Sequence, residues 1–132
     1  MSNGTLNGIA GVHLVAAELS VRGYSVAVTS RNTPGIDLFA TSPTTRKTYS
    51  IQVKTNGQER TPHFWLLGSK PITPHPNYFY VFVNIKHPPK LHEFYVVPSS
   101  IVLRHSAKRK TNWNSFYRAD GVRYRDRWSR LR

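Results

Sequence analysis

The sequence predicts an α/β fold with an α+β mixed sheet. Helices are expected to flank this single sheet. A helical pattern near the N-terminus precedes three strand-like segments with short turns between them. Further apolar strands and a helical, basic C-terminal segment follow. At this length we expect a single domain over residues 1–132, with residues 104–132 as its basic C-terminal segment.

The first expected element is a helix over residues 7–22. Its apolar residues recur at the spacing of one helical face: Val12, Val15, Ala16 and Leu19. Gly23 follows the last periodic residue, and glycine readily takes the left-handed conformation that ends a helix. The chain therefore begins with an amphipathic helix that needs a sheet to cover its apolar face.

Strands are expected where apolar residues alternate or cluster between turn-forming residues. These segments are residues 24–29, 36–41, 48–55, 64–67, 78–85 and 93–97. The first three form a meander because only short turns separate them. Residues 78–85 are the most apolar, so both faces of this strand are expected to be covered.

Two helices are expected in the C-terminal part of the chain. The first covers residues 100–107, where Pro98-Ser99-Ser100 offers an N-cap. The second covers residues 120–131, because three apolar residues share one helical stripe: Tyr124, Trp128 and Leu131.

The chain is strongly basic, with 19 Lys and Arg against 6 Asp and Glu and a net charge of +13. Such an excess repels itself in the compact state and indicates an anionic partner. We expect DNA, with RNA as the alternative. The residues expected to contact the phosphate backbone are Arg123, Arg127, Arg130, Lys108, Arg109 and Lys110.

Several classes of site are excluded by composition. The absence of cysteine excludes disulfides, thiolate zinc sites and cysteine nucleophiles. The sequence has no signal segment and no apolar run approaching the ~18 residues of a membrane span. We therefore expect a cytoplasmic protein without membrane contact.

Polar residues interrupt two of the apolar strands, in the segments Gly35-Ile36-Asp37-Leu38 and Ile51-Gln52-Val53-Lys54-Thr55. A hairpin turn between Thr44 and Thr45 places Asp37 opposite Gln52, with Lys54 on the same face. The apolar neighbours then fall on the opposite face, toward the core: Ile36, Leu38, Ile51 and Val53. A shift of one residue would destroy this separation.

These residue types suit metal-assisted phosphate chemistry. The Asp37 carboxylate is a hard ligand for Mg²⁺ or Mn²⁺, and the side-chain carbonyl of Gln52 and the main-chain carbonyl of Val53 supply neutral oxygens. Lys54 could orient or deprotonate an attacking water, or stabilise charge on a phosphate. The alternative is a surface Asp–Lys pair on a half-buried hairpin.

Taken in their order along the chain, Asp37, Gln52 and Lys54 resemble the motif of the PD-(D/E)XK nuclease superfamily. The matching segments are Thr33-Pro34-Gly35-Ile36-Asp37 and Gln52-Val53-Lys54, preceded by a helix similar to that of Holliday-junction resolvases. The Q-x-K form resembles Mrr-like restriction enzymes, in which Gln replaces the usual acid. The resemblance implies a restriction endonuclease-like fold, a metal-dependent endonuclease that hydrolyses DNA phosphodiester bonds, and catalytic roles for Asp37, Gln52 and Lys54.

Two positions depart from the resemblance. The proline that is normally adjacent to the Asp lies three residues before it, at Pro34, and the helix lacks an acid. Relatives with this helix usually carry Gly-Glu where this chain has Gly11-Val12, and that Glu helps to bind metal. Glu18 is a candidate replacement, but its spacing favours an ion pair with Arg22. With Asp37 as the single acid, we expect Mg²⁺ or Mn²⁺ to bind weakly in the free protein.

Three functions therefore remain open from the sequence. The first is the endonuclease. The second is a catalytically degenerate module of the same fold that binds nucleic acid without cutting it. The third is a structural or interaction subunit whose basic segment binds an acidic partner. Many nucleases of this fold dimerise to cut both strands, so a homodimer is one option, although no sequence feature fixes an interface.

Overall fold

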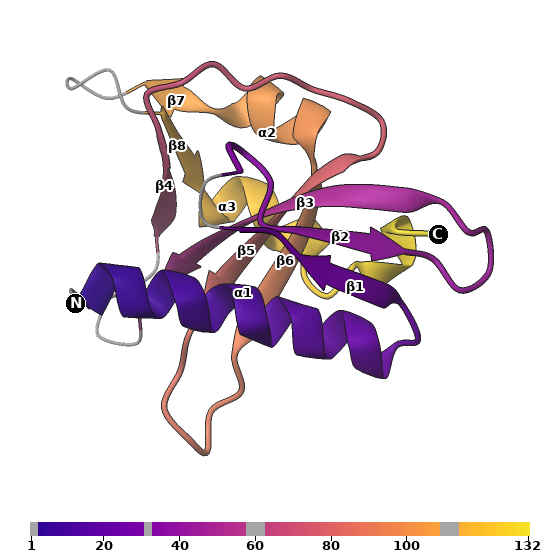
Figure 1. The fold of residues 1–132 in the computed structure, drawn as a ribbon. Helices are drawn as coiled ribbons and strands as arrows, with labels where there is room; N and C mark the ends of the chain where they lie inside the picture. Colours follow the sequence, from indigo (N-terminus) through magenta and orange to yellow (C-terminus); the bar gives the residue numbers. More distant parts are fainter. Residues whose placement is uncertain (1–2, 31–32, 58–62, 109–113) are drawn as a thin grey trace.

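A computed structural model of the chain describes residues 3–30, 33–57, 63–108 and 114–132. A helix comes first, a run of strands follows, and short helices and strands make up the C-terminal part (Figure 1). In chain order they are α1 (Asn3–Val21), β1 (Ser25–Val28), β2 (Leu38–Thr41), β3 (Thr48–Asn56), β4 (Phe64–Gly68), β5 (Tyr78–Asn84), β6 (Glu93–Pro98), α2 (Ser99–His105), β7 (Ala107–Lys108), β8 (Asn114–Tyr117), α3 (Arg118–Gly121) and the 3₁₀ turns η1 (Val122–Tyr124) and η2 (Trp128–Arg130). None of the described helices is long and apolar enough to cross a membrane.

The large sheet has the strand order β1-β2-β3-β5-β6. The strands β1, β2 and β3 form the predicted antiparallel meander, β5 runs parallel to β3, and β6 returns antiparallel to β5. The predicted α+β mixed sheet is therefore confirmed. The parallel step from β3 to β5 brings together residues that are far apart in the sequence.

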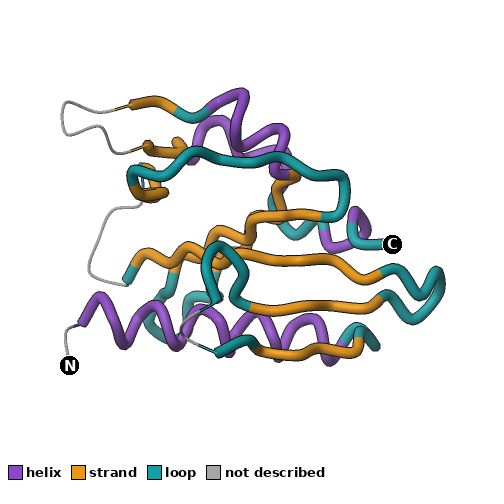
Figure 2. The backbone as a smooth tube through the Cα atoms, turned by 45° about the horizontal axis from the view of Figure 1, so that its top comes forward, coloured by secondary structure: helices purple, strands orange, loops and turns teal. Residues whose placement is uncertain are grey.

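The expectation of one sheet was wrong, because β4 pairs with β8 in a second sheet of order β4-β8-β7. In Figure 2 these strands gather at one side, apart from the strands of the large sheet. The reason is Trp65, whose ring packs on Phe82 and Tyr95 at centroid distances of 5.0 and 5.3 Å. This packing holds β4 over one face of the large sheet instead of at its edge.

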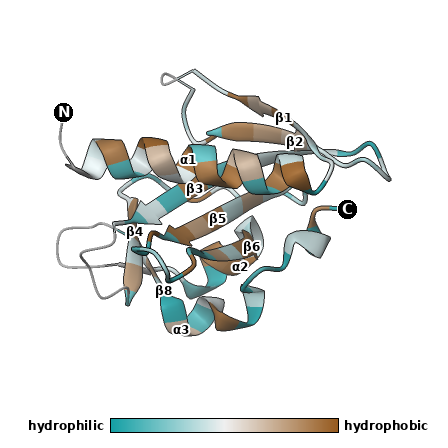
Figure 3. Ribbon diagram, turned by 90° about the horizontal axis from the view of Figure 1, so that it is seen from below, coloured by the Kyte–Doolittle hydropathy of each residue, from teal (hydrophilic) through white to brown (hydrophobic). Residues whose placement is uncertain are grey.

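Two apolar clusters cover the two faces of the large sheet. We call the face covered by α1 the helix face; Val15 and Leu19 of α1 pack there on Ile51, Val53 and other fully or nearly buried strand residues. Figure 3 shows α1 lying across the strands. We call the other face the pocket face; its cluster consists of Trp65, Tyr80, Phe82, Tyr95, Val97, Val102, Phe116 and Tyr124.

Two predicted helix starts needed correction. The helix α1 begins a turn before residue 7, and Asn7 within it lies over Gly57 at the end of β3, a tertiary contact that periodicity does not reveal. The helix α2 begins at Ser99 without a side-chain cap. The Ser99 hydroxyl is engaged elsewhere, because it donates to His75 O and accepts from His75 N–H, both at 3.0 Å.

The predicted terminal helix over residues 120–131 was wrong. The segment contains only the short α3 and the turns η1 and η2, because it crosses from one face of the sheet to the other. Tyr124 packs in the pocket-face cluster, whereas Trp128 and Leu131 pack in the helix-face cluster. A straight helix would hold these three side chains on one stripe.

The C-terminal segment also covers the outer edge of β6. Arg125 forms a β-bridge with Tyr95, and the Asp126 N–H donates to Phe94 O at 2.9 Å. The Glu93 carboxylate at the start of β6 lies 3.6 Å from the Arg118 guanidinium and 3.8 Å from that of Arg125. These contacts supply partners for an edge strand that would otherwise expose main-chain groups.

Candidate active site

The hairpin of β2 and β3 has the predicted register, with Leu38 opposite Ile51 and Ala40 opposite Tyr49. Leu38, Ile51 and Val53 are buried on the helix face. One expected core residue, Ile36, instead lines a pocket on the other face. It differs because β2 begins only at Leu38, so the alternation of the strand does not extend back to it.

Asp37 occupies the point where β2 separates from β3. Its N–H donates to Ile51 O at 2.8 Å, and its carboxylate oxygen Oδ2 accepts the Val53 N–H at 2.7 Å. The side chain thus replaces the main-chain acceptor that a longer β2 would supply to Val53. This hydrogen bond fixes the carboxylate beside β3.

The main chain of Val53 points to the same side as this carboxylate. The Ser50 N–H donates to Asn77 O, next to β5. Because main-chain groups alternate in direction along a strand, those of Ile51 and Val53 point toward β2. The Val53 carbonyl and the Asp37 carboxylate therefore lie at the same gap in the sheet, as two oxygen donors.

Gln52 and Lys54 lie on the pocket face, both half-buried. Burial lowers the pKa of Lys54, and the nearby Asp37 opposes this shift. Burial raises the pKa of Asp37, and the Val53 hydrogen bond and Lys54 together only partly offset it. Each charged group therefore carries a desolvation cost that its partner reduces, which is typical of functional sites.

Sequence analysis missed Tyr78, which contacts the site from β5. Its hydroxyl oxygen lies 2.8 Å from the amide terminus of Gln52 and 2.6 Å from Gly35 O. Gly35 has a φ of +71°, a left-handed conformation that suits glycine. Burial raises the pKa of Tyr78 well above its ordinary range, with the neighbouring Tyr80 adding to the shift, so the hydroxyl stays protonated.

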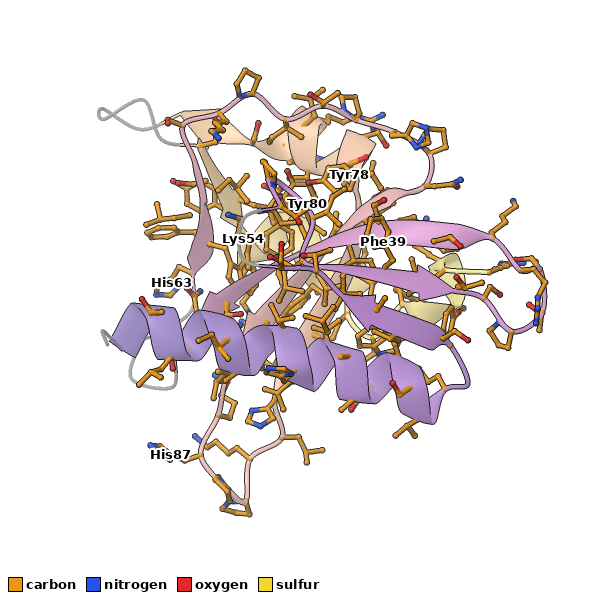
Figure 4. All side chains as sticks on the ribbon, in the orientation of Figure 1. Phe39, Lys54, His63, Tyr78, Tyr80 and His87 are labelled. Atoms are coloured by element: carbon orange, nitrogen blue, oxygen red, sulfur yellow. The ribbon has the colours of Figure 1, made fainter. Side chains whose placement is uncertain are left out.

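A pocket of about 870 Å³ opens on this face between β3, β5 and the segment 67–75. Its apolar walls are Pro34, Ile36, Leu67, Pro71 and Ile72, and its polar lining includes Ser50, Gln52, Tyr78, Tyr80 and His75. Lys54 and Lys70 are its cations, and none of its described lining residues is acidic. Figure 4 shows Lys54, Tyr78 and Tyr80 close together on this side of the sheet.

The oxygen donors suit a hard cation such as Mg²⁺ or Mn²⁺ but carry little charge. Asp37 contributes one carboxylate, and Gln52 and Val53 contribute neutral carbonyls. Among the described residues, no three His, Asp, Glu or Cys side chains form a group that could hold a metal ion. The donor set therefore fits a cation that an anionic ligand helps to bind.

The two helix positions considered for a second acid do not join the site. Val12 packs against the helix-face cluster, across the sheet from Gln52 and Lys54. Glu18 forms the expected exposed ion pair with Arg22 at 3.5 Å.

The basic residues predicted to contact nucleic acid are distributed differently. Three exposed arginines lie on the turns along and beyond the β6 edge: Arg123, Arg127 and Arg130. They do not form a helical stripe, because the terminal helix is absent. Lys108 is in β7, paired with Asn114 of β8, and Arg109 and Lys110 lie outside the described residues.

No protein-family model matches the chain, and no curated protein sequence matches it either. Among solved structures, a bacterial homing endonuclease, I-Ssp6803I, is similar with a TM-score of 0.71, covering 97% of this chain and 92% of that one at 13% identity. Hjc, a Holliday junction resolvase from Archaeoglobus fulgidus, is similar with a TM-score of 0.52, covering 83% and 90% at 13% identity.

These likenesses confirm the predicted fold. The chain has the restriction endonuclease-like fold of the PD-(D/E)XK nucleases.

Proposed function

We propose that this protein is a metal-dependent endonuclease that hydrolyses phosphodiester bonds in DNA. The observation that carries the proposal is the position of Asp37, fixed by the Val53 N–H beside the face that carries Gln52 and Lys54. The fold shared with a homing endonuclease and a Holliday junction resolvase supports it, as does the basic lining of the pocket.

The oxygen donors of the site have distinct roles in this proposal. Asp37 binds the cation through the carboxylate oxygen that the Val53 N–H leaves free, together with the Gln52 and Val53 carbonyl oxygens. The cation, when bound, supplies positive charge next to the phosphate. Because the site contributes one formal negative charge, the phosphate of bound DNA completes the charge balance, and metal and DNA bind cooperatively.

Lys54 acts on the attacking water or on the phosphate. Its lowered pKa makes the neutral amine more accessible than in an exposed lysine, so it can accept a proton from water. In the ammonium form it stabilises the charge that develops on the phosphoryl oxygens. Water attacks phosphorus, one bridging P–O bond breaks, and the leaving oxygen takes up a proton.

The test is cleavage of plasmid, duplex, branched and single-stranded DNA with Mg²⁺ or Mn²⁺. We expect Lys54→Met to reduce the rate on the order of 10²- to 10⁴-fold, the usual effect of losing a proton-transfer group. Asp37→Asn should also reduce the rate strongly, because it removes the charged ligand proposed for the cation. Asp37→Asn retains an oxygen to accept the Val53 N–H, so it removes charge with little change to the strand. Lys47→Met, an exposed lysine in the β2–β3 turn, is the matched control.

The alternative is a module that binds nucleic acid without cutting it. The observation that favours it is Val12, which packs against the helix-face cluster at the position where relatives carry a metal-binding acid. Cleavage that survives both substitutions contradicts the proposed site. Tight DNA binding with no cleavage of any of these substrates, by protein at wild-type stability, supports the alternative.

A further inference from the structure

We infer that Tyr78, anchored on Gly35, is a positioning residue that turns the carbonyl oxygen of Gln52 toward the pocket. Its effect on metal binding rests on the proposed function. The orientation of the amide itself does not, because it follows from the hydrogen bonds around Tyr78.

The hydroxyl of Tyr78 has two close neighbours but only one hydrogen. It lies 2.6 Å from Gly35 O and 2.8 Å from the Gln52 amide terminus placed as Oε1. A carbonyl oxygen only accepts hydrogen bonds. If both neighbours are carbonyl oxygens, one of these short contacts is a repulsion between two acceptors.

Reversing the Gln52 amide resolves this conflict. The nitrogen and oxygen of a glutamine amide have nearly the same shape, and their assignment follows from the surrounding hydrogen bonds. With Nε2 toward Tyr78, the amide donates to the hydroxyl oxygen, and the hydroxyl donates to Gly35 O. Each contact then joins one donor to one acceptor.

Tyr80 completes the arrangement. Its ring packs on that of Tyr78 with the ring centroids 5.4 Å apart, which holds the Tyr78 side chain beside Gln52. The parallel register places Gln52 beside Tyr80, so β3 and β5 hold all these groups together.

The reversed amide directs Oε1 away from Tyr78, into the pocket that Gln52 lines. Only the oxygen of an amide can bind Mg²⁺ or Mn²⁺, so the opposite orientation would present N–H groups to the cation. Tyr78 therefore decides whether Gln52 is a metal ligand. Gly35 assists because its left-handed backbone brings its carbonyl within reach of the Tyr78 hydroxyl.

The orientation can be tested without nuclease activity, by ¹⁵N NMR of side-chain amides. The chain has two glutamines, and Gln52→Glu identifies the signals of Gln52 by removing them. We expect the Gln52 amide hydrogens to be protected from exchange with water in the wild type and to lose this protection in Tyr78→Phe. Tyr49→Phe, which removes a hydroxyl bonded to Arg132 O on the helix face, is the control and leaves the protection unchanged.

The consequence for metal binding is tested by a double-mutant cycle. In Tyr78→Phe we expect the Mg²⁺ concentration for half-maximal cleavage to rise about 10-fold or more, the usual effect of losing a residue that orients a metal ligand, with kcat at saturating metal retained. In the Gln52→Glu background Tyr78→Phe should have little effect, because a carboxylate presents oxygen in either orientation. Equal losses in the two backgrounds, or an unprotected Gln52 amide in the wild type, overturn the inference. If the protein cuts no DNA, the exchange measurement still decides the orientation.

Discussion

At the scale of single residues, Asp37 combines a structural and a chemical role. One carboxylate oxygen accepts the Val53 N–H at the end of the β2–β3 ladder, which leaves the other for a ligand. Burial makes the ionised form of this side chain costly, as the raised pKa shows. Charged residues that lower the stability of the folded state in this way are typical of functional sites, where activity depends on them.

This cost makes the stability of the protein depend on pH. The pKa of Asp37 is raised above its ordinary value of 3.8, so the native state holds this proton more tightly than the unfolded chain does. The contribution of Asp37 to the free energy of unfolding therefore falls as the pH rises through the interval between the two pKa values. We expect Asp37→Asn, which cannot ionise, to gain stability relative to the wild type as the pH rises from the ordinary pKa of 3.8 toward neutrality.

Urea denaturation at several pH values measures this difference. Asp126→Asn, which removes an exposed carboxylate in the C-terminal segment, controls for the general loss of negative charge. A stability difference between Asp37→Asn and the wild type that stays constant across this range contradicts the expected cost.

Alternation along two strands was enough to predict that Gln52 and Lys54 share a face, since Ile51 and Val53 must point into the core. Tyr78 could not be found in this way. It is 26 residues from Gln52, and its contact depends on parallel pairing that no local pattern encodes. Tyr78 belongs to an apolar strand, where aromatic residues ordinarily indicate core packing, so the sequence did not indicate a polar role for its hydroxyl.

At the scale of elements, the packing of α1 on β3 depends on Gly11. A Cβ at this position would overlap Thr55 Oγ1 and lie 2.9 Å from Thr55 Cβ. The helix therefore approaches the sheet more closely here than a side chain would allow. The glycine that precedes the position of the missing acid thus has a packing role of its own.

We expect Gly11→Ala to destabilise the protein by about 1–3 kcal/mol, because the added methyl group overpacks the interface with Thr55. Gly8→Ala is a matched control in the same helix, where a Cβ meets nothing within 4 Å. It should stabilise the protein by roughly 0.5–1 kcal/mol, because alanine is the better helix former. Thermal or urea unfolding measures both, and equal effects of the two substitutions would refute the close approach.

The elements differ in how far local sequence determines them. The strands β2, β3 and β5 were predicted because their residue patterns match their burial, whereas β1 was predicted although most of its residues are exposed. The terminal helix was not, because the spacing of Tyr124, Trp128 and Leu131 fits a helix although these side chains serve two different clusters. For β4 the strand was predicted but not its sheet, since its partner β8 is about 50 residues away.

At the scale of the whole molecule, positive charge lies on more than one side. Lys54 and Lys70 line the pocket, whereas Arg123, Arg127 and Arg130 lie on the turns along and beyond the β6 edge. None of these three arginines is among the described residues that line the pocket. Their role in affinity is therefore separable from that of the site.

We expect reversal of the three arginines to Glu to weaken DNA binding and to flatten its dependence on salt. The slope of log K against log salt should decrease by about 0.9 for each phosphate that the variant no longer neutralises. Arg46, Lys47 and Lys90, three exposed cations elsewhere, provide a control with the same change in net charge. Fluorescence anisotropy at several salt concentrations makes the measurement, and equal slopes for the two triple variants would exclude the C-terminal arginines. Circular dichroism checks the fold, because Arg130 stacks on Tyr124 and Arg127 bonds to Arg123 O.

The path of the C-terminal segment has a consequence for biosynthesis. Trp128 and Leu131 fill the cluster beneath α1, and the hydroxyls of Tyr24 and Tyr49 bind the carbonyls of Leu131 and Arg132. During translation the N-terminal helix and the meander emerge long before these residues. The cluster beneath α1 therefore stays incomplete, and accessible to chaperones, until Trp128 and Leu131 have left the ribosome.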